Sequence, residues 1–254
     1  MKKTNYEKEF LNIFEIFHNK YPNWKVWNDF LYLSAVSMAN LFPSKEKKER
    51  EERYQAIWNQ YSGKEQELFA NLLATVTVAL DDNPEQDFLG KLFHRLELHQ
   101  QQKGQFFTPY NISHMMAELQ FTGASNCELE DKGYITVMDS ACGAGAMLIA
   151  FANVAKNHGI NYQREVLFMA QDIDQTAALM CYVQLSILGC PAIIIVGDSL
   201  AKPGFHPDNS VWYTPFYYCN QRKFQEFFAD AGSKTEEKKD NQSKNQKQKN
   251  QKVA

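Results

Sequence analysis

The chain has 254 residues, of which 44% are hydrophobic and 13% aromatic, so it can bury a substantial core as one large domain or two small ones. No apolar run approaches the roughly 20 residues that a membrane helix needs, and the first residues lead into an amphipathic segment, so we expect a cytoplasmic protein with no membrane span. The formal net charge of -3 does not by itself indicate a nucleic-acid binder. The five cysteines show no C-x-x-C spacing, so we expect neither a metal site nor a disulfide framework.

Residues 1–100 are predicted to form a helical domain. Tyr6, Phe10 and Phe14 recur at helical spacing, Trp24 and Trp27 continue the pattern, and residues 68–80 form another apolar stretch. Helical spacing of aromatic residues is first of all a packing signal, so we interpret them as the core of a helical bundle rather than a base-stacking surface.

The segment Asn83-Pro84-Glu85-Gln86 is predicted to begin a further helix. The Asn83 amide would cap it, Pro84 suits the first turn, and Gln86 can reach back. Phe88 and the apolar residues after it would form one buried stripe.

After Gly104 the pattern changes to alternating strands and helices. Strands are expected at residues 135–138, 166–170 and 192–197, and helices at 147–155 and 177–188, with Asp174 capping the second helix. Such alternation predicts a doubly wound α/β sheet over residues 101–232. Residues 233–254, with seven lysines and almost nothing apolar, are expected to be a disordered tail that serves as a solubilising end or as an arm on DNA.

Three acids fall at or just after the ends of the expected strands: Asp139, Asp172 and Asp198. Ligands of open parallel sheets bind beyond the carboxyl ends of the strands, so these carboxylates would line one crevice. Gly143 and Gly145 allow a tight turn and close approach of the backbone to a ligand. Three carboxylates suit a cationic, hydroxyl-rich ligand better than a pyrophosphate, and S-adenosylmethionine has an ammonium group, a sulfonium, a ribose diol and an adenine amine.

Four blocks occur in an order that resembles the methylation subunit of type I restriction-modification systems and related adenine-N6 DNA methylases. They are Asp87-Phe88-Leu89-Gly90, Gly104-Gln105-Phe106-Phe107-Thr108-Pro109, Asp139-Ser140-Ala141-Cys142-Gly143-Ala144-Gly145-Ala146 and Gln171-Asp172-Ile173-Asp174. The resemblance implies a helical N-terminal domain followed by a truncated Rossmann-like, S-adenosylmethionine-dependent methyltransferase domain. Ser140 stands where the family usually has proline.

The resemblance also assigns the residues of the cofactor site. The residues that would close over the methionine end are Gln105, Phe106, Phe107, Thr108, Pro109 and Tyr110. Those that would hold the amino group and shape the turn are Asp139, Gly143, Ala144, Gly145 and Ala146. Asp172 would accept from the ribose hydroxyls with Ile173 beside it in the site, and Asp198 would take the adenine amine.

The motif that holds the target base departs from the family. Where these enzymes carry Asn-Pro-Pro-Tyr or Asn-Pro-Pro-Phe, the chain reads Tyr213-Thr214-Pro215-Phe216. If this segment overlays the motif as a degenerate catalytic site, a phenol replaces the amide that accepts from the flipped adenine, while Phe216 would still stack. Replacing Tyr213 and Thr214 by Asn and Pro is then expected to raise methylation.

The resemblance leaves two functions open. The first is a DNA adenine-N6 methyltransferase that needs a partner, such as a specificity subunit or a complementary subunit that completes the sheet and reads DNA, because little sequence remains for the later strands. The second is a catalytically silent S-adenosylmethionine-binding protein with a regulatory or DNA-associated role. A nicotinamide dehydrogenase is disfavoured, because the turn lacks the G-x-G-x-x-G pattern.

Overall fold

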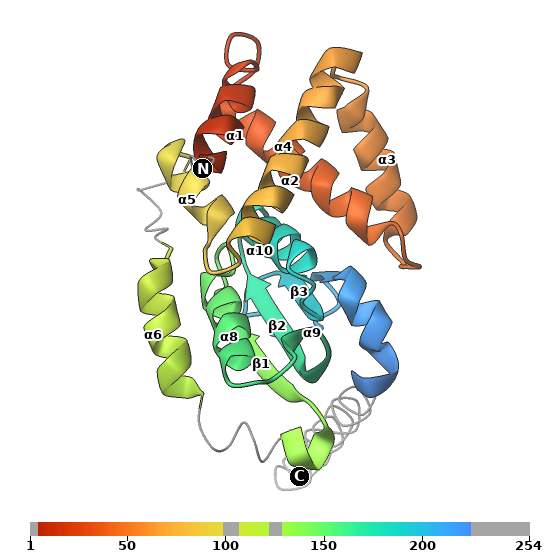
Figure 1. Ribbon diagram of the computed structural model, residues 1–254. Coiled ribbons are helices and arrows are strands. Elements are labelled where there is room, and N and C mark those ends of the chain that lie inside the picture. The colour runs from red at the N-terminus through yellow and green to blue at the C-terminus, as the bar shows by residue number, and fades with distance from the viewer. Residues whose placement is uncertain (1–4, 99–106, 122–128, 225–254) are drawn as a thin grey trace, which may run out of the picture. The chain divides into compact units, whose positions relative to one another are not determined.

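The computed structural model describes residues 5–98, 107–121 and 129–224 (Figure 1). Residues Met1–Cys219 form one compact unit and Asn220–Ala254 a second. In the described ranges we find no helix with the length and apolarity to cross a membrane. The expected tail, residues 233–254, lies outside these ranges, and a domain boundary near residue 100 stays a prediction.

The amino-terminal part of the first unit is helical. Its helices are α1 (Tyr6–Glu15), α2 (Asn23–Ala39), α3 (Lys47–Trp58), α4 (Gly63–Asp82) and α5 (Phe88–Arg95). α1 packs on α4, and α2 packs on α3 and on the later helix α10 (Figure 1).

Aromatic rings fill the core of this helical part. The ring of Phe10 is fully buried and lies 6.0 Å from that of Trp27, 5.5 Å from that of Phe30 and 6.3 Å from that of Phe88, between ring centroids. Each of these pairs has an edge-to-face geometry, which aromatic quadrupoles favour. These residues therefore pack the bundle on itself, as their helical spacing predicted.

The helix after Asn83 begins later than the sequence suggested. α4 runs on to Asp82, and Gln86 Nε2 donates to the carbonyls of Ala79 and Asn83 at 2.9 Å each, which ends α4. Asp87 is the N-cap of α5, where its side chain accepts from the backbone N–H of Gly90 at 2.8 Å. The prediction that Asn83 caps this helix was therefore wrong, because the segment that follows it is used to close the preceding helix.

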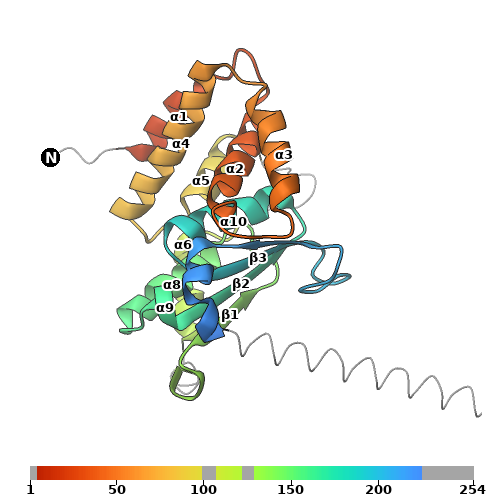
Figure 2. The same cartoon turned by 90° about the vertical axis from the view of Figure 1, so that its right-hand side faces the viewer.

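The remaining elements form a mixed sheet of four strands with helices around it. The strands are β1 (Ile135–Asp139), β2 (Val166–Asp172), β3 (Ala192–Val196) and β4 (Ser210–Tyr213). Their order in the sheet is β1-β2-β3-β4; the first three are parallel and β4 runs antiparallel to β3. Figure 2 shows β1, β2 and β3 side by side in this order. The α/β class is confirmed, whereas the antiparallel strand was not foreseen.

Two crossover helices connect the parallel strands. α8 (Ala146–Asn157) leads from β1 to β2 through the short α9 (Tyr162–Glu165), and α10 (Gln175–Ile187) leads from β2 to β3. Both crossovers step in the same direction, so right-handed connections place both helices on one face of the sheet, and these crossovers do not wind over both faces as the sequence predicted. α6 (Tyr110–Gln120) packs against α8.

The outer edge of β4 is closed by α3. Arg50 is buried, its Nη2 donates to the carbonyl of Val211 at 2.8 Å, and its guanidinium carbon lies 3.7 Å from the ring centroid of Trp212. Glu46 forms an ion pair with Arg50 and accepts from Ser210 Oγ at 3.1 Å. An exposed strand edge can pair with another chain, so Arg50 protects the β4 edge of the sheet. The opposite outer strand is β1, which pairs only with β2 among the strands in the described ranges.

Replacing Arg50 with Met should lower the free energy of unfolding by about 2 kcal/mol, because a buried, charge-assisted hydrogen bond and a cation–π contact are lost together. Urea unfolding followed by circular dichroism measures the change. Lys48→Met is the control: its pair with Glu52 spans 3.9 Å between exposed side chains, so the variant should change stability by less than about 0.5 kcal/mol. Equal stabilities of the two variants would contradict the role given to Arg50.

Candidate functional site

The carboxyl ends of β1 and β2 bring two acids to one turn. Asp139 ends β1 opposite Ala170 of β2, and Asp172 ends β2. The Oδ2 atom of Asp172 accepts from the N–H of Gly143 at 2.8 Å, and its Oδ1 accepts from the N–H of Asp174 at 2.9 Å. The side chain of Asp172 is thus held against the turn that follows β1, as expected for neighbouring parallel strands.

Two residues of this turn must be glycine. Gly143 has φ +54° and Gly145 has φ +96°, conformations that L side chains rarely adopt. A Cβ atom on Gly143 would lie 2.9 Å from the Phe107 ring, and one on Gly145 would lie 2.9 Å from Cys181 Sγ. Backbone strain and lack of space therefore both exclude larger residues, and the Phe107 ring lies over the turn.

The two acids carry a desolvation cost. Burial raises the pKa of Asp172 and of Asp139 above the ordinary aspartate value, although backbone N–H groups donate to both. None of the ion pairs found in the described part of the chain involves either acid. A ligand that brings positive charge or hydroxyl donors would offset this cost. Ile173, directly after Asp172, leaves 71% of its surface exposed and offers an apolar face at the same place.

A buried polar network ties the turn to the helices. Gln184 of α10 donates from Nε2 to Asp87 Oδ1 and to the carbonyl of Ala144, both at 2.8 Å. Its Oε1 accepts from the N–H of Leu89 at 3.0 Å. Asp87 is buried, and desolvation raises its pKa. The sequence analysis missed Gln184; the available signal was a glutamine within an otherwise apolar helix.

The same network explains the glycine of Asp87-Phe88-Leu89-Gly90. A Cβ atom on Gly90 would lie 1.9 Å from Asp87 Oδ2, so the carboxylate can fold back over the start of α5 only if residue 90 is glycine. An acid followed three residues later by glycine is therefore the sequence pattern of this helix cap.

Only part of the segment predicted to close over the cofactor lies in the described ranges. Gln105 and Phe106 are outside them. The Phe107 ring stacks on Phe93 with centroids 5.5 Å apart, while Thr108 and Pro109 lead into α6. The Tyr110 hydroxyl accepts from Asn153 Nδ2 of α8 at 3.1 Å, and burial raises its pKa to about 12. Tyr110 thus fixes α6 to α8.

Asp198 lies just after β3, at the same end of the parallel strands as Asp139 and Asp172. Its Oδ1 accepts from the N–H groups of Leu200 at 2.9 Å and Ala201 at 3.0 Å, and these bonds lower its pKa. Asp198 therefore caps a turn, and a role in holding an adenine amine stays a prediction.

The structure does not bring Tyr213, Thr214, Pro215 and Phe216 to this site. Because β4 is antiparallel, Tyr213 pairs with Ile193 near the amino end of β3, whereas the acids follow the carboxyl ends of the parallel strands. Thr214 is fully buried; its Oγ1 donates to the carbonyl of Cys190 at 2.7 Å and accepts from the N–H of Ala192 at 2.8 Å. The geometry therefore does not support the expected overlay on the catalytic motif. A proline at 214 would also lose both bonds.

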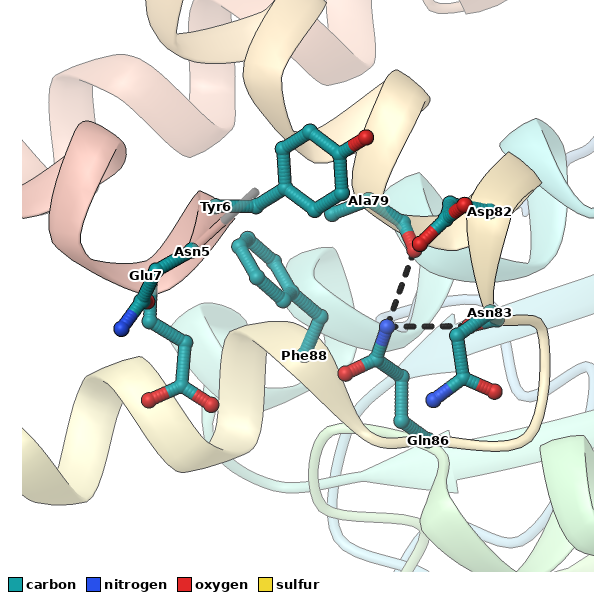
Figure 3. A pocket seen from close by; sticks show the side chains of 8 residues that line it. All are labelled: Asn5, Tyr6, Glu7, Ala79, Asp82, Asn83, Gln86 and Phe88. Carbon is teal, nitrogen blue, oxygen red and sulfur yellow. Dashed lines mark hydrogen bonds between the residues drawn. The ribbon is translucent and has the colours of Figure 1, made fainter. Parts of the chain in front are cut away.

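A cavity of about 350 Å³ lies between the start of α1, the end of α4 and the start of α5 (Figure 3). Two of its polar side chains already have partners: Glu7 pairs with Arg95 at 2.8 Å, and the Gln86 amide donates to α4. None of the predicted site residues lines it, and it adjoins the point where the described chain begins. We assign it no function.

Gly90→Ala should lower the free energy of unfolding by about 2 kcal/mol or more, because the new methyl group expels the Asp87 carboxylate from its buried cap. Gly63→Ala is the matched control in another helix, where nothing lies within 4 Å of the added Cβ, and it should stabilise the protein by about 0.5 kcal/mol. Denaturant unfolding of both variants tests the cap, and a stable Gly90→Ala protein would refute it.

Thr214→Val should destabilise the protein by about 2 kcal/mol, since it leaves the N–H of Ala192 and the carbonyl of Cys190 without their side-chain partner. Its affinity for S-adenosylmethionine, measured by calorimetry, should equal that of the unchanged protein. A selective loss of affinity without loss of stability would instead place residue 214 at the binding site.

Comparison with known proteins identifies the family to which the chain belongs. Residues 86–253 match the N-6 DNA Methylase family. No curated protein matches the chain. Among solved structures, the chain is similar to the type I restriction-modification system methyltransferase subunit from Streptococcus thermophilus, at 12% identity and a TM-score of 0.35. That alignment covers 73% of this chain and 56% of the other, so this chain corresponds to little more than half of that subunit. Because the family match takes in more than half of the 254 residues, the chain belongs to the N-6 DNA methylase family.

Proposed function

We propose that the chain binds S-adenosylmethionine at the turn between β1 and α8 and serves as the cofactor-binding part of a DNA adenine-N6 methyltransferase. One observation carries the proposal: the desolvated Asp172 carboxylate, held by two backbone N–H groups, lies beside a glycine turn and near Asp139. Membership of the N-6 DNA methylase family supports it.

The residues present fit this cofactor. Each Asp172 oxygen accepts one backbone hydrogen bond, which leaves a lone pair on each for a ribose hydroxyl. Asp139, whose Oδ1 accepts from Ala141, offers its other oxygen to an ammonium group. The exposed Ile173 gives the adenine ring an apolar surface.

The cofactor supplies a methyl group on a sulfonium, and the chain's residues bind and orient it. Gly143 and Gly145 let the backbone come close to the ligand, while Phe107 covers the turn and limits access of water. Asp139 and Asp172 supply the negative charge that a cationic ligand requires.

We assign the binding of the target base and the recognition of the DNA sequence to a partner subunit. Among the strands of the described ranges, the edge without a neighbouring strand is that of β1, because Arg50 covers the edge of β4. Met138 of β1 leaves 55% of its surface exposed on this outer strand. A partner that adds a strand beside β1 would therefore complete the sheet next to the cofactor, where the group that accepts from the adenine amine is needed.

The second candidate is a catalytically silent S-adenosylmethionine-binding protein with a regulatory or DNA-associated role. The observation that favours it is the structural use of Thr214, which leaves residues 213–216 away from the acids. Methylation of DNA by this chain with its partner subunit separates the two functions, because only the first yields N6-methyladenine.

Calorimetric titration with S-adenosylmethionine tests the cofactor site. The unchanged protein should bind saturably, and Asp172→Asn should bind at least about tenfold more weakly, because the substitution removes a charge and an acceptor from the ligand. Asp208→Asn is the matched control, since Asp208 is exposed and paired with Lys202 at 2.7 Å. Equal affinities of the two variants would refute the site.

The stability of Asp172→Asn separates lost binding from misfolding. The folded-state pKa of Asp172 is raised, so its protonated form favours folding below the ordinary aspartate pKa of about 3.9, and this contribution is lost as the pH rises through the raised pKa. Removal of the desolvated charge should therefore raise the stability of Asp172→Asn relative to the unchanged protein as the pH rises from about 3 to 7, while loss of one acceptor oxygen lowers its stability at every pH. A stability difference that does not change with pH would indicate that the weak binding results from structural damage.

A further inference from the structure

The segment between β3 and β4, residues 197–209, is held by one buried glutamine. We call this segment the β3–β4 loop. Gln171 of β2 is fully buried. Its Nε2 donates to the carbonyls of Gly197 at 3.2 Å and Lys202 at 3.0 Å, and its Oε1 accepts from the N–H of Gly204 at 2.9 Å. Both ends of the side-chain amide therefore bond to this loop.

A second buried amide holds the same loop from its far end. The Nδ2 atom of Asn209 donates to the carbonyls of Lys202 at 2.8 Å and Gly204 at 2.7 Å. The carbonyl of Lys202 thus accepts from two side chains, one in β2 and one in the loop itself. Buried polar groups are costly when they lose a partner, so these bonds give the loop a fixed conformation without a ligand.

The backbone of Gln171 reaches the other side of the ligand site. Its carbonyl accepts from the N–H of Cys142 at 3.0 Å, in the turn that follows β1. The next residue is Asp172, whose carbonyl accepts from the N–H of Gly197 at 2.9 Å. Gln171 therefore lies between the glycine turn and the β3–β4 loop, while its three side-chain bonds all run to the loop.

The loop begins beside the acids and carries one of them. Asp198 directly follows Gly197, the residue that bonds to Asp172. Its Oδ1 caps the turn that contains Leu200, while Oδ2 takes no part in those two bonds. Leu200 leaves 94% of its surface exposed. The conformation of the loop therefore sets where the Asp198 carboxylate and the Leu200 side chain lie relative to Asp172.

We propose that Gln171 is a positioning residue of the ligand site. Its side chain holds the β3–β4 loop before a ligand binds, so that Asp198 and Asp172 face the same ligand. The inference rests on the proposed binding of S-adenosylmethionine and adds to it a residue whose side chain acts through the loop. Without the amide, the loop has to be ordered at the moment of binding, and this ordering lowers the affinity.

Limited proteolysis with chymotrypsin tests whether Gln171 holds the loop. Gln171→Met keeps the length of the side chain and removes its three hydrogen bonds, so cleavage after Phe205, mapped by mass spectrometry, should become at least about tenfold faster. Thr214→Val is the matched control, because it also removes buried hydrogen bonds but none to this loop. Equal cleavage rates in the two variants overturn the proposal.

Calorimetric titration with S-adenosylmethionine tests the effect on the ligand. Gln171→Met should bind at least about fivefold more weakly than Thr214→Val, because only the first variant has to order the loop on binding. Equal affinities of these two variants overturn the positioning role.

A double-mutant cycle shows whether Gln171 acts through Asp198. Asp198→Asn should weaken binding in the unchanged protein but have little further effect in Gln171→Met, because the released loop no longer presents residue 198. Asp139→Asn is the control substitution, since the Gln171 side chain bonds to the loop rather than to the turn after β1; its effect should multiply with that of Gln171→Met. Multiplying effects of Gln171→Met and Asp198→Asn overturn the proposal.

Asn209→Ala repeats the test without a substitution in the sheet. It removes the second amide from the carbonyls of Lys202 and Gly204, so cleavage after Phe205 should be faster and S-adenosylmethionine should bind more weakly. An Asn209→Ala protein with the cleavage rate and the affinity of the unchanged chain contradicts the proposal.

The outcome is distinguishable from failure of the proposed function. If the unchanged protein never binds S-adenosylmethionine, the proposed function fails, while the cleavage rates still decide whether Gln171 holds the loop. If binding is lost in Asp172→Asn but Gln171→Met binds as tightly as Thr214→Val, the proposed function stands and the positioning role falls.

Discussion

The hydrogen bonds of Gln184 are the constraint on which the site depends. This one amide joins Asp87 at the start of α5, the N–H of Leu89 and the carbonyl of Ala144 in the glycine turn. Buried polar groups are costly when they lose a partner, so the three segments keep a fixed relation to one another. The helical part therefore supports the turn that the ligand would contact.

The two edges of the sheet serve different purposes. Arg50 and Glu46 close the edge of β4, whereas β1 carries Asp139, leads into the glycine turn and has no further strand beside it in the described ranges. The residues proposed to hold a cofactor are thus gathered at one end of the chain's own sheet. The group that must accept from a target base has no counterpart there among the described residues, and this is why a partner beside β1 is central to the proposed function.

Function and stability oppose each other at this site. Burial raises the pKa of Asp139 and of Asp172, so the unliganded protein bears the cost of two desolvated carboxylates at neutral pH. A cationic, hydroxyl-rich ligand would recover that cost as binding free energy.

The sequence by itself determined the local features: the parallel strands, the left-handed Gly143 and Gly145, and the acids at the strand ends, because each follows from short-range pattern and backbone sterics. Tertiary structure decided what depends on distant partners. Because β4 is antiparallel, residues 213–216 lie near the amino ends of the parallel strands, away from the acids. Asp87 rather than Asn83 caps α5. Gln184 bonds to residues about 40 and 97 positions away in the chain. Strand pairing and buried hydrogen bonds link residues far apart in the chain, so no local pattern specifies them.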